Sequence, residues 1–169
     1  MSHNEPTPSP APAARSLAGK YLTFALSREE YGLPVLKVRE IIKMMDITAV
    51  PQVPAAIRGV MNLRGKVIPV IDLRIRFGLP AQADTDRSSI IVVDLQVGGD
   101  RVLMGVVVDA VRDVLNITDQ EIQEPPPFGT EVATDFMTGL AKVKGTVKIL
   151  LDLDVLFRED AAAVVEHAA

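Results

Sequence analysis

GVMNLRGKVIPVIDLRIRF, at residues 59–77, returns 80 residues later as GLAKVKGTVKILLDLDVLF, at residues 139–157. The two stretches align without a gap, and 6 of their 19 positions are identical. The identical pairs are Gly59/Gly139, Gly65/Gly145, Val67/Val147, Asp72/Asp152, Leu73/Leu153 and Phe77/Phe157. A run of this length that returns with the same glycines and the same aspartate indicates an internal repeat.

A second pair of matching segments lies upstream of the first. Residues 31–42 (YGLPVLKVREII) match residues 104–115 (MGVVVDAVRDVL) at an offset of 73, so the second copy has a middle loop seven residues longer. The identical pairs are Gly32/Gly105, Val35/Val108, Val38/Val111 and Arg39/Arg112. Because the matched segments follow in the same order, we predict two similar subdomains, split roughly at 20–85 and 86–158, with exchange of strands between them left open.

Both halves carry the patterns of short strands and tight turns. Apolar and other residues alternate in 21–27 and 91–97, which predicts half-buried strands. Residues 98–100 (GGD) predict a tight hairpin, and Arg64-Gly65 and Lys144-Gly145 stand as matched turns between apolar strands. Short strands in halves too small for a layered fold predict a mainly β protein built from two small closed barrels. Closure also hides sheet edges, which are an aggregation hazard in Val-rich chains.

A few short helices are predicted from capping residues. Asp72 and Asp152 each follow a strand and precede an L-x-x-x-F run, where an aspartate can cap the first turn of a helix. Thr118 and Glu121 have the spacing of a capping box.

The ends of the chain and its Pro-rich segments are expected to lie outside the barrels. Residues 1–19 hold four prolines between positions 6 and 12 and no apolar core of a signal peptide, so they predict a disordered tail. Residues 47–54 and 124–128 are expected to be rigid connectors, and 159–169 a C-terminal tail. The apolar run 102–108 is far shorter than the roughly 20 residues of a membrane span. We therefore expect a cytoplasmic protein without membrane insertion.

The composition argues against an enzyme. The 169 residues include no Cys, and the two His stand at positions 3 and 167, so thiolate sites and a Ser-His-Asp triad are not expected. No phosphate-binding glycine motif is present. Asp72 and Asp152 sit in the context D-L, not on the tight D-T-G loop of an aspartic dyad, and Asp152-x-Asp154 lacks further spaced oxygen ligands for a cation. No cofactor and no metal are expected.

Two binding classes stay open. A nucleic-acid-binding barrel is the different-class alternative, because basic residues cluster in 58–76, but the net charge of −4 and 4% aromatic content give little support for nucleic acid. The basic residues are Arg58, Arg64, Lys66, Arg74 and Arg76. The other class is a protein-binding module. A mean hydropathy of +0.23 fits either apolar surface kept for partners or a Val-rich core.

The sequence resembles the CheW family of bacterial chemotaxis coupling proteins over about residues 20–158. The resemblance rests on residues 21–42, 48–78, 105–115 and 136–153, above all on I-R-G-V-x-N-L-R-G-x-V-I-P-V-I-D-L-R. It implies a CheW-like domain of two SH3-like five-stranded barrels. It also implies a non-enzymatic adaptor that couples the histidine kinase CheA, through its regulatory domain, to the cytoplasmic tips of methyl-accepting chemoreceptors. Such a protein would be recruited from the cytoplasm to membrane-associated receptor arrays. A CheW-like adaptor of a pilus-motility or other chemosensory-type pathway is the alternative.

The resemblance also implies which residues bind each partner. An arginine on a hairpin tip can hold a carboxylate in two parallel hydrogen bonds, and apolar side chains can line a groove for a helix. For the valines, filling the barrels is the alternative, and for Arg64 it is an ordinary turn. The implied receptor-binding residues are Val38, Ile41, Arg64, Val111 and Val114, and the implied kinase-binding residues are Glu40, Arg64 and Phe128.

Overall fold

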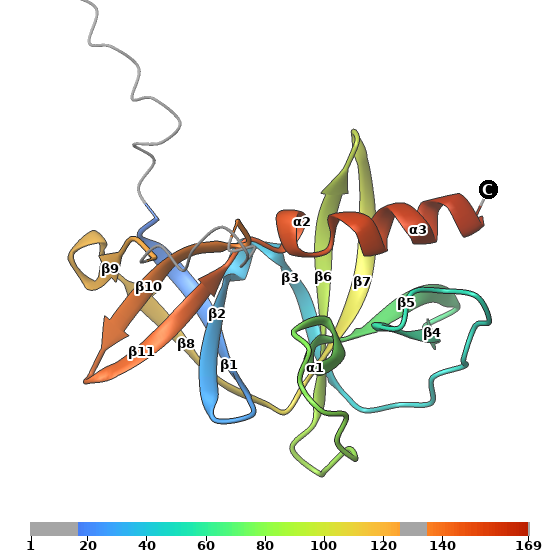
Figure 1. Cartoon of the computed structure of the whole chain (residues 1–169), viewed down its shortest axis with the longest axis horizontal. Helices are drawn as coiled ribbons and strands as arrows, with labels where there is room; N and C mark the ends of the chain where they lie inside the picture. Colours follow the sequence, from blue (N-terminus) through green and yellow to red (C-terminus); the bar gives the residue numbers. More distant parts are fainter. Residues whose placement is uncertain (1–16, 126–134, 169) are drawn as a thin grey trace, which may run out of the picture.

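The computed structural model describes residues 17–125 and 135–168, and these residues form two β-sheets with short helices around them (Figure 1). The strands are β1 (Gly19–Leu26), β2 (Glu29–Pro34), β3 (Val38–Lys43), β4 (Ile57–Leu63), β5 (Lys66–Asp72), β6 (Ser89–Val97), β7 (Asp100–Val108), β8 (Ala110–Ile117), β9 (Ile122–Gln123), β10 (Met137–Val143) and β11 (Thr146–Leu151). The helices are η2 (Val35–Lys37), α1 (Leu73–Arg76), η3 (Asp119–Glu121), α2 (Leu153–Leu156) and α3 (Arg158–Ala168).

The strands divide into a five-stranded and a six-stranded sheet. The five-stranded sheet has the order β3-β6-β7-β5-β4 and lies to the right in Figure 1, and the six-stranded sheet has the order β8-β1-β2-β11-β10-β9 and lies to the left. Because β9 is only two residues long, each sheet consists of five substantial strands. The predicted fold class, mainly β with two small SH3-like units and a few short helices, is confirmed.

Each of the two units is less completely closed than the expected barrels. In the five-stranded sheet, the chain beyond β3 makes one bridge to β4, with hydrogen bonds of 2.8 Å in both directions between Thr48 and Val60. In the six-stranded sheet, β9 takes this place, since Gln123 pairs with Leu140 of β10. The described residues therefore approach closure through short contacts, without a long ladder between the outer strands.

The two sequence repeats exchange their hairpins. The β1–β2 hairpin of the first repeat completes the six-stranded sheet, and the β6–β7 hairpin of the second repeat completes the five-stranded sheet. The joints are parallel strand pairs at equivalent positions, with Gly105 opposite Val70 and Gly32 opposite Leu150. The boundary expected near residue 85 thus separates the repeats but not the sheets: one sheet comes from residues 38–108, the other from 19–34 and 110–151.

The largest apolar core lies between the two sheets and belongs to both. It joins Phe24 and Leu26 of β1 to Ile91 and Val93 of β6, and Phe157 is a fully buried member of it. A smaller cluster around Met61 and Ile68 fills the five-stranded unit, and another around Tyr21 and Leu150 fills the six-stranded unit. Much of the apolar content that raised the mean hydropathy is therefore core.

The predicted helix caps are confirmed. The Asp72 carboxylate accepts a hydrogen bond from the Arg74 amide at 3.0 Å, and the Asp152 carboxylate accepts one from the Val155 amide at 3.2 Å. The predicted capping box is also present, since the Thr118 amide donates to Glu121 Oε1 at 2.9 Å.

Helix α3 occupies residues 158–168, where the sequence was interpreted as a tail. Its alanine-rich start (REDAAA) has high helix propensity, and Ala161 is fully buried in the core between the sheets. In Figure 1 the helix runs across the five-stranded sheet beside β6. No helix among the described residues is long and apolar enough to cross a membrane.

Candidate partner-binding site

The turn between β4 and β5 presents Arg64 to solvent. Arg64 and Gly65 have φ values of 52° and 84°, so both central residues of this two-residue turn are left-handed, as a type I′ hairpin requires. The Asn62 side chain accepts a hydrogen bond from the Gly65 amide at 2.8 Å. The turn holds the backbone of Arg64 in place, while its side chain stays 72% exposed.

Arg64 forms a bidentate ion pair with Glu40 of β3. Arg64 Nη1 donates to Glu40 Oε1 at 2.7 Å, and Arg64 Nη2 donates to Glu40 Oε2 at 2.6 Å. These hydrogen bonds lower the pKa of Glu40 from its usual value and raise the pKa of Arg64. Two residues that were assigned to partner binding separately thus form one unit on the surface of the five-stranded sheet.

The ion pair stands at the rim of a shallow pocket of about 400 Å³. The buried side chains of Ile68 and Val92 contribute its apolar floor, and the charged residues are at its edge. The lining residues are Arg39, Glu40, Leu63, Arg64, Lys66, Ile68, Val92 and Leu103. An apolar floor with a charged rim is the usual composition of a small protein-docking site.

The four apolar residues implied for receptor binding fall into two structural classes. Val38 and Val111 are half-buried and pack against the core between the sheets, opposite Val93 and Phe24 respectively. Their packing supports the interpretation that these two valines fill the fold.

Ile41 and Val114 are the outward-facing class. Ile41 is 44% exposed on β3, and Val114 is 58% exposed on β8. Ile41 and Val114 are equivalent positions of the two repeats, as are Val38 and Val111. The structure therefore leaves one of these apolar residues on each strand, Ile41 on β3 and Val114 on β8, available to a partner.

Several residues of this surface were missed in the sequence. Leu36, on the connection between the sheets, is 96% exposed, yet it lies in an apolar stretch that gives no sign of this. Arg39 and Lys66 flank the ion pair, and only their charge and their places beside Glu40 and the turn could have pointed to them. Phe128 lies outside the described residues, and its assignment to kinase binding stays a prediction.

The described residues contain no group of three or more His, Cys, Asp or Glu side chains arranged to hold a metal ion. The groups that the site offers are a paired arginine and carboxylate, neighbouring basic side chains and apolar surface. These groups suit recognition of another protein by hydrogen bonding and burial.

Comparison with known proteins gives a consistent result over most of the chain. Residues 20–161 match the model of the CheW-like domain. A chemotaxis protein CheW from Klebsiella aerogenes is 36% identical over 157 residues, covering 93% of this chain and 92% of that protein. Protein FrzA from Myxococcus xanthus is 31% identical over 126 residues, covering 75% of this chain and 76% of that protein. The crystal structure of the scaffolding protein TtCheW from Thermoanaerobacter tengcongensis superimposes with a TM-score of 0.72 at 40% identity, covering 83% of this chain and 93% of that one.

Proposed function

The chain belongs to the CheW family of chemotaxis scaffold proteins, and on that premise we propose that it couples the histidine kinase CheA to methyl-accepting chemoreceptors. It does so as a non-enzymatic adaptor, working from the cytoplasm and recruited to receptor arrays at the membrane. The regulatory domain of the kinase and the cytoplasmic tip of the receptor are its two partners.

The ion pair between Arg64 and Glu40 is the observation that carries the proposal. It is exposed, it is held by a rigid turn, and it borders an apolar pocket. A partner that offers its own carboxylate or guanidinium can exchange hydrogen bonds with this pair without unfolding anything. Arg64 then contributes to both contacts, and Glu40 to the contact with the kinase.

The receptor contact is proposed at the exposed apolar residues of β3 and β8. Ile41 and Val114 would insert into the apolar stripe of the receptor helix, while Val38 and Val111 support the two strands from behind. Phe128 is assigned to a second kinase contact. Each contact is small, so the affinities would be modest and assembly would depend on several contacts acting together.

Coupling follows from shared contacts. A conformational change in the receptor can alter kinase activity only if the adaptor's contacts differ in free energy between the kinase states. An adaptor that joins both partners to one small, tightly packed domain transmits such a difference without any chemistry of its own.

A second candidate exists for the signalling pathway in which the adaptor works. The similarity to FrzA, over three quarters of both chains, favours considering a related chemosensory system such as pilus motility. The neighbouring genes, flagellar or pilus, would separate the two.

The nucleic-acid alternative has little support, because most of the basic cluster is already neutralised within the fold. The ion pairs are Arg58 with Asp72 and Asp84, Arg64 with Glu40, Arg74 with Asp109, and Arg76 with Asp160. Strong salt-dependent binding to single strands, with no retention of kinase, would reverse this preference.

The test is co-precipitation with the cognate kinase and a receptor cytoplasmic fragment. We expect the wild type to form the ternary complex and Arg64→Glu to lose receptor coupling or kinase activation. Lys144→Glu is the matched control, because Lys144 has the same φ of 52° in the equivalent turn of the other repeat. A wild-type protein that binds neither partner would refute the adaptor proposal, and equal behaviour of the two variants would make Arg64 an ordinary turn residue.

A charge-reversed pair sharpens the test. Arg64→Glu combined with Glu40→Arg can re-form the internal ion pair and should keep the fold. If the pair acts on partners, this double variant stays defective in assembly. Restored assembly would assign the pair a purely internal role.

A further inference from the structure

Two arginines of the five-stranded sheet share one buried carboxylate. Asp94 of β6 lies between Arg39 of β3 and Arg101 of β7, and its side chain is only 8% exposed. Asp94 Oδ2 accepts a hydrogen bond from Arg101 Nη2 at 2.6 Å and lies 3.5 Å from Arg39 Nε. Arg39 is the extra residue of a β-bulge between Val38 and Glu40. One carboxylate thus brings two guanidinium groups together at one point of the sheet.

Stability alone does not account for this group. Asp94 Oδ1 is buried and has no hydrogen-bond partner among the described residues, which costs stability. Both arginine side chains remain largely exposed, Arg39 at 58% and Arg101 at 67%. Neither guanidinium group forms a further hydrogen bond or ion pair with a described residue. Most of their N–H donors are therefore available to a partner.

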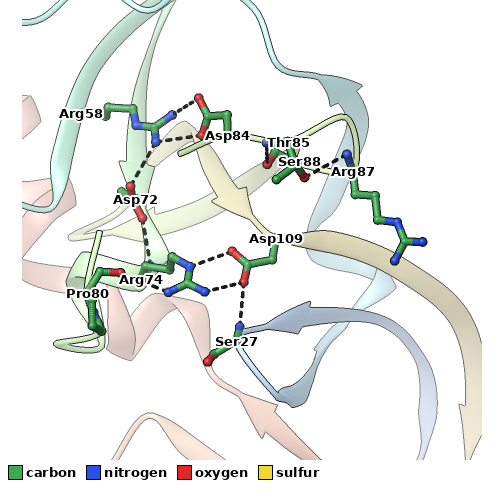
Figure 2. Close-up of polar contacts among 10 residues, drawn as sticks. All are labelled: Ser27, Arg58, Asp72, Arg74, Pro80, Asp84, Thr85, Arg87, Ser88 and Asp109. Atoms are coloured by element: carbon green, nitrogen blue, oxygen red, sulfur yellow. Dashed lines mark hydrogen bonds and ion pairs between the residues drawn. The ribbon is translucent and has the colours of Figure 1, made fainter. Parts of the chain in front are cut away.

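The arginines that hold the fold together are arranged differently (Figure 2). Arg74 Nε and Nη2 donate to the two carboxylate oxygens of Asp109, each at 2.9 Å, and Nη1 donates to the Pro80 carbonyl at 3.0 Å. The Arg74 side chain is only 12% exposed. Arg58 likewise donates from both terminal nitrogens to two carboxylates of the fold. The donors of these groups are engaged within the protein, whereas those beside Asp94 are not.

The six-stranded sheet has arginines at the aligned positions but no carboxylate between them. At the offset of 73, Arg39 and Arg101 align with Arg112 of β8 and with Arg28, in the turn before β2. Ala25 of β1 occupies the place of Asp94, since each pairs with the aligned residue of the next strand. Arg112 reaches Glu30 only at 3.9 Å, and Arg28 forms no ion pair with a described residue. The chain thus offers its own control for the role of Asp94.

The arginine pair continues the rim of the pocket at the β4–β5 turn. Arg39 lines that pocket, and so does Leu103, the partner of Asp94 in the β6–β7 hairpin. Val92, on the same face of β6 as Asp94, belongs to the apolar floor. The charged residues of rim and pair are the cations Arg39, Arg64, Lys66 and Arg101 and the carboxylates Glu40 and Asp94. This group is therefore positive, although the whole chain carries a net charge of −4.

We propose that Asp94 positions Arg39 and Arg101 as an arginine clamp for one carboxylate of the docked partner. The inference rests on the proposed function, in which this face binds the kinase, and it names the group that the kinase presents there, an aspartate or glutamate side chain. Two guanidinium groups can surround a carboxylate with charge-assisted hydrogen bonds. The apolar floor beside the arginine clamp suits an apolar side chain next to that acidic residue.

Asp94 acts on binding in two opposite ways, which makes its role testable. Its negative charge opposes an approaching carboxylate, so by charge alone its removal would speed association and tighten binding. Its contacts also hold together two guanidinium groups that repel each other, so its removal would separate them and speed dissociation. The positioning role therefore predicts weaker binding by Asp94→Ala in spite of the added positive charge.

The first test measures association and dissociation of the full chain with the full-length cognate kinase by biolayer interferometry. We expect Arg39→Gln and Arg101→Gln each to weaken binding about tenfold, with less dependence on salt. Asp94→Ala should weaken binding through faster dissociation. Arg112→Gln and Arg28→Gln remove the same charge from the other sheet and should bind like the wild type. All four arginine side chains are exposed, so these variants should keep the urea midpoint.

Each outcome has a distinct meaning. Binding by Arg39→Gln and Arg101→Gln that equals the wild type would overturn the arginine clamp and leave the adaptor function intact. Tighter binding by Asp94→Ala would overturn the positioning role. A wild-type chain that does not bind the kinase would refute the proposed function, and the clamp with it.

The second test identifies the partner's group by cross-linking. Carboxyl groups of the kinase are converted to N-hydroxysuccinimide esters with a carbodiimide, and excess reagent is removed before Arg101→Lys is added. The new amine attacks an ester carbonyl within reach, N-hydroxysuccinimide leaves, and an amide bond joins the two proteins. We expect mass spectrometry to find position 101 linked to an aspartate or glutamate of the kinase, and no such link from Arg28→Lys. No link from position 101, or equal linking from both positions, would overturn the proposal.

Discussion

Gly59 of β4 lies directly against the carbonyl oxygen of Thr48. A Cβ atom on Gly59 would stand 2.0 Å from that oxygen, and the φ of Gly59 is 151°. Thr48 forms the bridge to Val60, the residue after Gly59, and this bridge brings the chain after β3 onto β4. In the second repeat, a Cβ atom on Gly139 would stand 2.9 Å from Ile122 Cγ2 and 3.1 Å from the carbonyl oxygen of Gln123. The close approach explains why both copies of the repeat begin with glycine.

Gly59→Ala is therefore expected to be severely destabilising. The substitution combines a clash with backbone oxygen and an unfavourable φ, so we expect a loss of about 3 kcal/mol in the free energy of unfolding. Gly145→Ala is the matched control: its φ of 82° is also unfavourable, but the space around it is open, and about 1 kcal/mol is expected. Urea unfolding of both variants measures the difference, and equal losses would mean that the approach of Thr48 is unimportant.

The ion pair at the turn gives a prediction for titration. Because hydrogen bonds from Arg64 lower the pKa of Glu40, the pair stabilises the fold above the ordinary pKa of a glutamate, and this contribution is lost as the pH falls through the lowered value. Carbon NMR of the Glu40 carboxyl should show the low pKa in the wild type and a value closer to normal in Arg64→Gln. An unchanged pKa in the variant would show that the pair does not persist in solution.

Substitutions of the core-packed Val38 and of the exposed Ile41 on β3 should affect stability and receptor binding separately. Val38→Ala removes packing from the core between the sheets and should cost about 1 kcal/mol of stability. Ile41→Ala removes an exposed side chain and should leave the urea midpoint nearly unchanged while weakening retention by the receptor fragment. Val111→Ala and Val114→Ala should repeat the contrast on β8. Loss of stability in Ile41→Ala with normal receptor binding would contradict this assignment.

The buried carboxyl of Asp160 in helix α3 has a pKa shifted upward, in the opposite direction from that of Glu40. Burial raises the pKa of Asp160 and Glu159 adds to the rise, while Arg76, at 3.0 Å, opposes it. The folded chain therefore binds this proton more tightly than the unfolded chain, so the contribution of Asp160 to stability is largest in acid and is lost as the pH rises through the raised pKa. Asp160→Asn lacks this dependence, and its urea midpoint should improve relative to wild type as the pH rises. A relative decline would mean that the ion pair with Arg76 prevails over burial.

The local features of the fold could be predicted because they depend on residues near one another in the chain. The Arg64-Gly65 turn and the caps at Asp72 and Asp152 each need only a few neighbouring residues, and the repeat at residues 59–77 and 139–157 doubles the signal. The division into sheets could not be predicted in this way. The apolar alternation predicts each hairpin and its buried face, but it does not identify the sheet to which the hairpin belongs.

The exposure of single apolar residues also could not be predicted from the sequence. Leu36 and Val38 lie two residues apart in one Val- and Leu-rich stretch, yet the first is 96% exposed and the second packs against the core. The difference arises from the crossing between the sheets, which only the complete fold defines. For the same reason, the ion pair of Glu40 with Arg64, 24 residues apart, joins two residues that sequence reasoning had placed only by family resemblance.

The exchange of hairpins has a consequence for synthesis on the ribosome, where the chain emerges from its N-terminus. The β1–β2 hairpin is made first, but its partner strands β8 and β11 are made much later, and Lys148 follows its partner Glu30 by 118 residues. In the meantime the hairpin cannot take the place of β6 and β7 beside β3, because the three residues between β2 and β3 are too few for the crossover that this arrangement would need. The nascent chain must therefore leave its hairpin without its native partners, with its edges exposed, until the second half of the chain has been made.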